Sequence, residues 1–137
     1  MFTTGKNNSS KILLDNIDSN NKLYLKNSFT TSVNQLERKL KSDEFDLVIS
    51  FGQAPIDKDT IKIETRANNI DCYNTNYNYD YLKTNIEKDY NVIISTDAGN
   101  YLCNNIYYYG LKYIKKNNLK TKMTFIHIHN INNISDI

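Results

Sequence analysis

Apolar residues along this 137-residue chain recur with two spacings, which predict strands and helices in alternation. Short apolar runs rich in β-branched residues predict buried strands, most clearly at residues 46–51 (DLVISF) and 90–94 (YNVII). Apolar positions three or four residues apart predict helices, most strongly from Asn100 to about Lys116. The same patterns predict further strands at residues 2–5, 22–26, 60–65 and 123–128, and further helices from Ser9 or Ser10 to Ile17, from Thr31 or Ser32 onward, and at residues 81–89.

Strands that alternate with helices are typical of an α/β domain. We therefore expect a three-layer α/β/α sandwich with a largely parallel, mixed sheet. The length fits a single domain over residues 1–137. The polar, tyrosine-rich segment at 68–80 is predicted to be a surface loop.

Charge and composition exclude several classes of partner. Lys and Arg number 17 against 15 Asp and Glu, and this balance indicates neither a nucleic-acid-binding nor a membrane-surface protein. No apolar run approaches the roughly 20 residues of a membrane-spanning helix, and the first residues lack the apolar core of a secretory signal. The two cysteines, Cys72 and Cys103, form no disulfide framework. A cytoplasmic location is therefore predicted.

The candidate chemistry begins at Cys103. It lies in the first turn of a predicted helix, directly after a predicted strand and the Ala98-Gly99 turn. Free backbone N–H groups and the positive end of the helix dipole favour a thiolate at that position. A lowered thiol pKa would make the cysteine nucleophilic. The alternative is that Cys103 is a small hydrophobic residue of the core, and Cys72 is interpreted as a loop thiol.

A nucleophilic cysteine needs a base and a group that orients this base. Strand alternation puts Phe125, His127 and His129 on one face of the last predicted strand, where either imidazole can face the start of the cysteine helix. Glu64, at the end of another predicted strand, could accept a hydrogen bond from a histidine Nδ1–H and fix the tautomer. Taken alone, the histidine could be structural and the glutamate a solvated strand residue.

Three motifs together resemble the pyroglutamyl peptidase I (pyrrolidone-carboxylate peptidase) family, peptidase family C15. Residues 95–104 (STDAGNYLCN) are similar to its S-x-x-A-G-x-[YF]-[VL]-C-N nucleophile motif. Residues 125–127 (FIH) resemble its histidine strand. Residues 52–54 (GQA), followed by Glu64 and Asn69, resemble the block that carries the acidic member of the triad. The resemblance covers most of the chain.

The resemblance implies a phosphorylase/hydrolase-like sandwich and a cysteine peptidase that removes an N-terminal pyroglutamyl residue from peptides. Cys103 would be the nucleophile, His127 the general base and acid, and Glu64 the orienting carboxylate. Gln53 would lie by the substrate pocket, and Asn74 stands where the family has an arginine near the oxyanion. The family implies no metal or organic cofactor, a peptide with a blocked N-terminus as partner, a cytosolic location and a possible homo-oligomer.

The chain also departs from the family pattern. The phenylalanine-rich loop after the first glycine is replaced by Lys6-Asn7-Asn8, and the family's long C-terminal helix has no counterpart before Ile137. These departures keep two alternatives open. The first is a catalytically impaired or inactive homologue that acts as a binding or oligomerisation module. The second is a cysteine hydrolase with a different acyl substrate.

Overall fold

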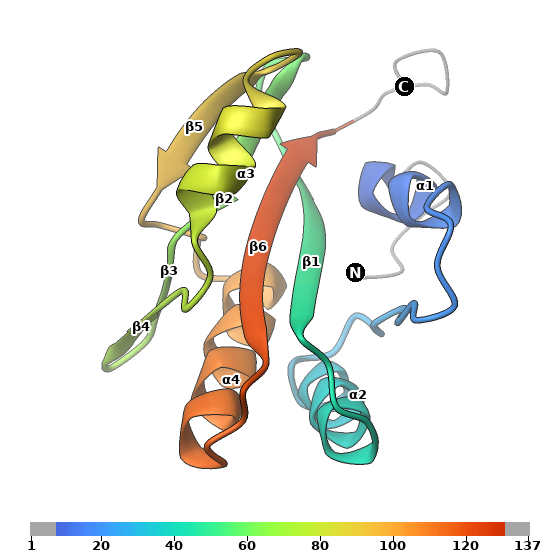
Figure 1. Ribbon diagram of the computed structural model, residues 1–137, viewed down its shortest axis with the longest axis vertical. Helices are drawn as coiled ribbons and strands as arrows, with labels where there is room; N and C mark the ends of the chain where they lie inside the picture. Colours follow the sequence, from blue (N-terminus) through green and yellow to red (C-terminus); the bar gives the residue numbers. More distant parts are fainter. Residues whose placement is uncertain (1–7, 131–137) are drawn as a thin grey trace.

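The computed structural model describes residues 8–130 of the chain. Helices and strands follow one another in the order drawn in Figure 1. The helices are α1 (Ser9–Asp15), α2 (Phe29–Ser42), α3 (Tyr79–Ile86) and α4 (Leu102–Lys116). The strands are β1 (Leu47–Ala54), β2 (Thr60–Glu64), β3 (Arg66–Asn68), β4 (Cys72–Asn74), β5 (Asn91–Ser95) and β6 (Lys122–His129). No helix among these residues is both long enough and apolar enough to span a bilayer.

Four strands form one mixed sheet in the order β1-β6-β2-β5. The pairs β1–β6 and β2–β5 are parallel, whereas β2 and β6 are antiparallel. The predicted α/β class with a mostly parallel, mixed sheet is therefore confirmed. The last strand inserts between β1 and β2, so Gly52 lies opposite His127 on one side of β6 and Glu64 lies opposite Phe125 on the other.

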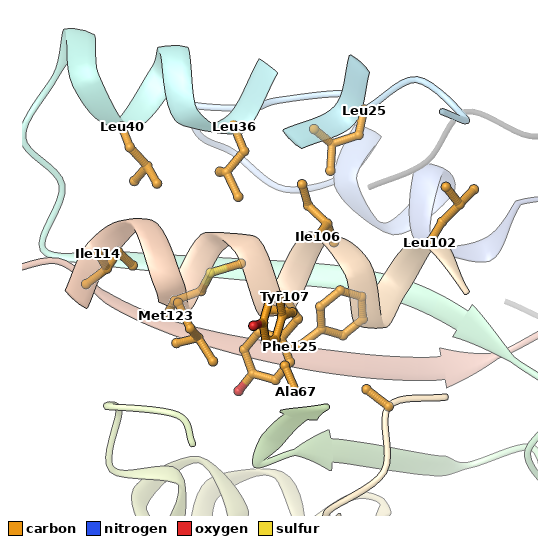
Figure 2. Packing of buried hydrophobic residues seen from close by; sticks show 13 residues of the cluster. Leu25, Leu36, Leu40, Ala67, Leu102, Ile106, Tyr107, Ile114, Met123 and Phe125 are labelled. Atoms are coloured by element: carbon orange, nitrogen blue, oxygen red, sulfur yellow. The ribbon is translucent and has the colours of Figure 1, made fainter. Parts of the chain in front are cut away.

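The hydrophobic core lies between this sheet and the helices α2 and α4. Leu36 and Leu40 of α2 face Ile106 and Ile114 of α4, and the side chains of β6 close the core from the sheet side (Figure 2). The spacing of the apolar residues produces this packing, because positions three and four apart fall on one face of a helix. In Figure 1, α3 lies in front of the sheet and α4 lies behind it.

Two local predictions differ from the structure. Residues 22–26 form no strand, and only Leu25 makes an isolated β-bridge there. The predicted loop at residues 68–80 contains β4, which pairs with β3 as a short antiparallel hairpin. Its strands are three residues each, too short to show alternation. The predicted strand at residues 2–5 lies outside the described residues.

The helix ends depend on side chains that periodicity does not reveal. Asn8 caps α1 by accepting from the Lys11 N–H, and Ser28 caps α2 by accepting from the Thr31 N–H. Each capping residue therefore precedes the serine or threonine that the sequence pattern favours as the cap. The apolar stripe predicted for α2 is confirmed, because Leu36 and Leu40 are buried.

Candidate active site

Cys103 is the second residue of α4 and therefore lies in the first turn of the helix, as the sequence pattern predicts. The residue before the helix, Tyr101, is extended and makes no side-chain cap. The first helical hydrogen bond of the main chain runs from the Asn105 N–H to the Tyr101 carbonyl, at 3.0 Å. The N–H groups of residues 102–104 therefore have no partner within the helix. They supply hydrogen-bond donors beside the thiol.

The Cys103 thiol packs directly against Gly52 of β1. A Cβ atom on Gly52 would lie 2.8 Å from Cys103 Sγ and 3.0 Å from two ring atoms of Phe125. Only a glycine leaves this space to the sulfur. In the sequence, Gly52 stands out as part of a family motif, but its contact with the thiol cannot be predicted there because the two residues are distant in the chain.

His127 lies on the same side of the sheet as the thiol. Gly52 and His127 are register partners on parallel neighbours β1 and β6, and side chains at paired positions point to the same face. The His127 ring contacts the Phe125 ring at a centroid distance of 5.0 Å, which agrees with the predicted shared face. Among the described residues no hydrogen bond to Cys103 Sγ is formed. The thiol and the imidazole are therefore neighbours at Gly52 without a direct bond.

Glu64 and His127 form a buried, hydrogen-bonded pair. His127 Nδ1 lies 2.9 Å from Glu64 Oε1. The Glu64 side chain is fully buried, and its second oxygen, Oε2, has no hydrogen-bond partner in the described part of the chain. The main chain of Glu64 is held from α4, because the Tyr107 hydroxyl donates to the Glu64 carbonyl at 2.8 Å. The structure thus brings together the predicted base and its predicted orienting carboxylate.

The thiol does not have the low pKa predicted from its place at the helix start. Burial, with a smaller contribution from the nearby Glu64 carboxylate, raises the pKa of Cys103 to about 11. Desolvation penalises the charged thiolate relative to the neutral thiol. The prediction is wrong because burial depends on packing against β1, which helix position alone does not reveal. At neutral pH the thiol is protonated and depends on a base for activation.

Gln53 lies on β1 next to Gly52, and its side chain points to the opposite face of the sheet. Gln53 Oε1 accepts from the Ser9 N–H at 2.9 Å and from the Ser9 hydroxyl at 3.3 Å, at the start of α1. The structure therefore ties Gln53 to α1 and does not bring it to the Cys103 side.

Asn74 is also separated from the thiol. It is exposed on β4, where its Oδ1 accepts from Arg66 Nε at 3.1 Å. Asn74 lines a surface hollow with Leu111 and Ile114, more than two helical turns beyond Cys103. Asn74 therefore does not lie near the oxyanion position that the family pattern implies for it.

The two remaining candidates, His129 and Cys72, lie on different strands. His129 shares the His127 face of β6 and pairs in register with Ala54. Cys72 is a free, exposed thiol on β4. Within residues 8–130 no group of three or more His, Cys, Asp or Glu side chains is arranged to hold a metal ion.

The fold is shared with known peptidases. The pyrrolidone carboxyl peptidase of Thermococcus litoralis superposes with a TM-score of 0.78 over 93% of this chain and 73% of that one, at 22% identity. The chain has the pyrrolidone carboxyl peptidase fold. The family model described as pyroglutamyl peptidase matches residues 81–135, the segment that includes Cys103 and His127. The resemblance to this family that the motifs indicate is confirmed.

Two further peptidase structures share this fold. The pyrrolidone carboxyl peptidase of Fervidobacterium islandicum AW-1 has a TM-score of 0.79 and 22% identity, and the match covers 94% of this chain and 76% of that one. Pyroglutamyl peptidase I of Bacillus amyloliquefaciens has a TM-score of 0.72 and 21% identity, and the match covers 80% of this chain. This chain spans 64% of the length of the Bacillus enzyme. Comparison with curated protein sequences finds no significant match.

Proposed function

We propose that this protein is a cysteine peptidase that removes an N-terminal pyroglutamyl residue from peptides. The observation that carries the proposal is the buried His127–Glu64 hydrogen bond of 2.9 Å, on the face of the sheet where the Cys103 thiol packs against Gly52. The family match over residues 81–135 and the shared fold support a peptidase of this kind. The proposed partner is a peptide with a blocked N-terminus.

The proposed reaction starts with proton transfer. Glu64 Oε1 accepts from Nδ1–H of His127, which leaves Nε2 unprotonated and able to take the thiol proton. Because burial raises the pKa of Cys103 to about 11, this transfer accompanies the attack of Sγ on the pyroglutamyl carbonyl carbon. Backbone N–H groups at the start of α4 stabilise the oxyanion, an effect of about 3 kcal/mol for one donor in other acyl-transfer enzymes.

The intermediate then breaks down in two steps. The imidazolium of His127 returns its proton to the departing amine as the C–N bond breaks, which leaves a thioester on Cys103. His127 next takes a proton from water as the water oxygen attacks the thioester carbon. The C–S bond then breaks, pyroglutamate leaves, and His127 returns the proton to Cys103 Sγ. The chemistry uses these side chains, the backbone N–H groups at the start of α4, and water. The proposal includes no cofactor, and we place the reaction in the cytoplasm.

The second candidate is an inactive homologue that keeps the fold as a binding or oligomerisation module. Two observations favour it: the raised pKa of Cys103, and the absence of a hydrogen bond between its Sγ and any described residue. In this case the Glu64–His127 pair would serve only to stabilise the sheet. Hydrogen bonds of apo sites are often long and tighten only with substrate, so both candidates are compatible with the geometry.

The deciding experiment measures release of a fluorophore from a pyroglutamyl amide. We expect the wild-type protein to hydrolyse it and Cys103→Ala to lose at least about 10³-fold in rate, because the nucleophile is removed. Cys72→Ser is the matched control, and we expect it to keep the wild-type rate because that thiol is exposed on β4. Equal rates for wild type and Cys103→Ala would contradict the proposal and favour the inactive homologue. Hydrolysis of other N-blocked amides alone would indicate a different acyl specificity.

A further inference from the structure

A lysine accompanies the buried pair. Lys62 lies on β2 two residues before Glu64, so both side chains point to the same face. In the antiparallel pairing of β2 with β6, Lys62 is the register partner of His127. Its Nζ lies 3.8 Å from Glu64 Oε1, the same oxygen that His127 Nδ1 contacts at 2.9 Å. One carboxylate oxygen therefore has two basic neighbours.

The burial of Glu64 makes the charge of its neighbours important. The Glu64 side chain is 0% exposed and its Oε2 has no partner among the described residues, so an ionised Glu64 depends on nearby positive charge. The Lys62 side chain is 28% exposed, which lets its ammonium stay partly hydrated while it faces the carboxylate. A lysine with a purely solvent-facing role would point away from the core, whereas Lys62 points to the face that carries the buried Glu64.

The other groups around the pair are few in the described part of the chain. Helix α4 contributes the Cys103 thiol and the Tyr107 phenol, and β6 contributes His129 on the same face. Strand β1 contributes Gly52, and β5 contributes Ile93 and Ser95 at the positions paired with Lys62 and Glu64. Lys62 is thus the lysine whose Nζ faces Glu64, at 3.8 Å from Oε1.

We propose that Lys62 is a positioning residue that keeps Glu64 ionised and His127 neutral near neutral pH, a role that rests on the proposed use of His127 as a base. A fixed positive charge favours the carboxylate and disfavours a second positive charge on the neighbouring ring. The same charge holds the carboxylate at Oε1, where it fixes the His127 tautomer. Lys62 acts only through Glu64 and His127 and touches no reacting atom.

The first test is an NMR titration of the imidazole signals in a His129→Gln background, which leaves His127 as the single histidine. We expect Lys62→Met to move the titration midpoint upward by about one pH unit, because a neighbouring positive charge is lost. Lys62→Arg, which keeps the charge, should leave the midpoint near that of the parent. An unchanged midpoint in folded Lys62→Met would overturn the proposal, as would an equal shift in Lys62→Arg.

The second test follows the acid limb of the pH profile of kcat/KM for a pyroglutamyl amide. In Lys62→Met this limb should move to higher pH, like the titration midpoint. On the acidic side kcat/KM should fall by up to about tenfold, and it should recover at higher pH. Lys39→Met is the matched control and should not move the limb, because this lysine of α2 pairs with Asp43, the residue that follows the helix. A purely structural role for Lys62 would lower the rate equally at every pH.

The two tests separate this inference from the proposed function. A shifted titration midpoint in a protein without peptidase activity would leave the charge relation intact and remove the catalytic function. Activity with Cys103-dependent kinetics but no shift in either test would keep the function and overturn the role of Lys62.

Discussion

The side chain that Gly52 lacks would occupy the space that the Cys103 thiol fills. The nearest approach of its added Cβ would be 2.8 Å to Sγ, with the Phe125 ring at 3.0 Å, so the thiol or the ring would have to shift. Gly52 also faces His127 across the β1–β6 pair. At the scale of single residues, this glycine sets how close the thiol comes to the strand that carries the imidazole.

We predict that Gly52→Ala displaces Cys103 and destabilises the protein by about 1–3 kcal/mol, as overpacking of a filled core does. The displaced thiol should be less buried, so iodoacetamide should label it faster in a Cys72→Ser background while amide hydrolysis falls. Urea unfolding and the labelling rate measure the two effects.

Gly110→Ala is the control for this substitution. Its added Cβ would meet Met123 Sδ at 2.6 Å and Leu36 Cδ2 at 3.0 Å, which are parts of flexible side chains that can move. The labelling rate of Cys103 should then stay at the parental value. Equal labelling rates in the parent and in Gly52→Ala would show that the glycine does not control the thiol.

Helix α4 carries two functions of the site on one face. Cys103 lies in its first turn, and Tyr107, one turn later, donates its hydroxyl to the Glu64 carbonyl at 2.8 Å. The Tyr107 ring is fully buried and contacts Phe125 at a centroid distance of 5.6 Å. The helix therefore positions its own nucleophile and also holds the end of β2, where the Glu64 side chain contacts His127.

Tyr107→Phe should destabilise the protein by about 1 kcal/mol or somewhat more, because a buried carbonyl loses its donor while the ring still packs. We expect a lower urea midpoint and a reduced kcat, since the end of β2 is less firmly held. Tyr113→Phe on the same helix is the control, and its effect should stay within about 0.5 kcal/mol. Equal unfolding curves for wild type and Tyr107→Phe would argue against the hydrogen bond to Glu64.

At the scale of the molecule, the site is built from four segments that are distant in sequence. Strand β6 inserts between β1 and β2, and this brings Gly52, Glu64 and His127 side by side under the start of α4. The same packing buries groups that would ionise in water. Burial raises the pKa of Cys103 to about 11, and burial raises the pKa of Tyr107 to about 12.

These shifts predict a loss of stability in alkali. Between pH 9 and 11 for the thiol, and between pH 10 and 12 for the phenol, the unfolded chain releases a proton that the folded protein retains. The unfolded state then binds fewer protons, so the free energy of unfolding falls as pH rises. Urea unfolding at pH 8 and pH 10.5 should show this decrease, and Cys103→Ala should reduce it. The same decrease in wild type and Cys103→Ala would contradict a buried, protonated thiol.

Local periodicity was sufficient for the elements that carry the chemistry. The helical spacing after Gly99 places Cys103 in the first turn of α4, and strand alternation places Phe125 and His127 on one face of β6. Both patterns depend only on neighbours a few residues apart, which is why they can be recognised without the fold. Short paired segments such as β3 and β4 lack enough residues to display a period.

The order of the amino acids indicates which residue types could perform the chemistry and on which helix and strand they lie. Three features follow from the folded chain alone: β6 runs antiparallel to β2, Gly52 makes room for the thiol, and Gln53 and Asn74 lie away from the thiol. Folding also sets the ionisation of Cys103, because desolvation comes from side chains that packing brings in from other segments. Spacing along the chain carries local geometry, whereas burial and charge at a site are sums over neighbours that the chain meets only when folded.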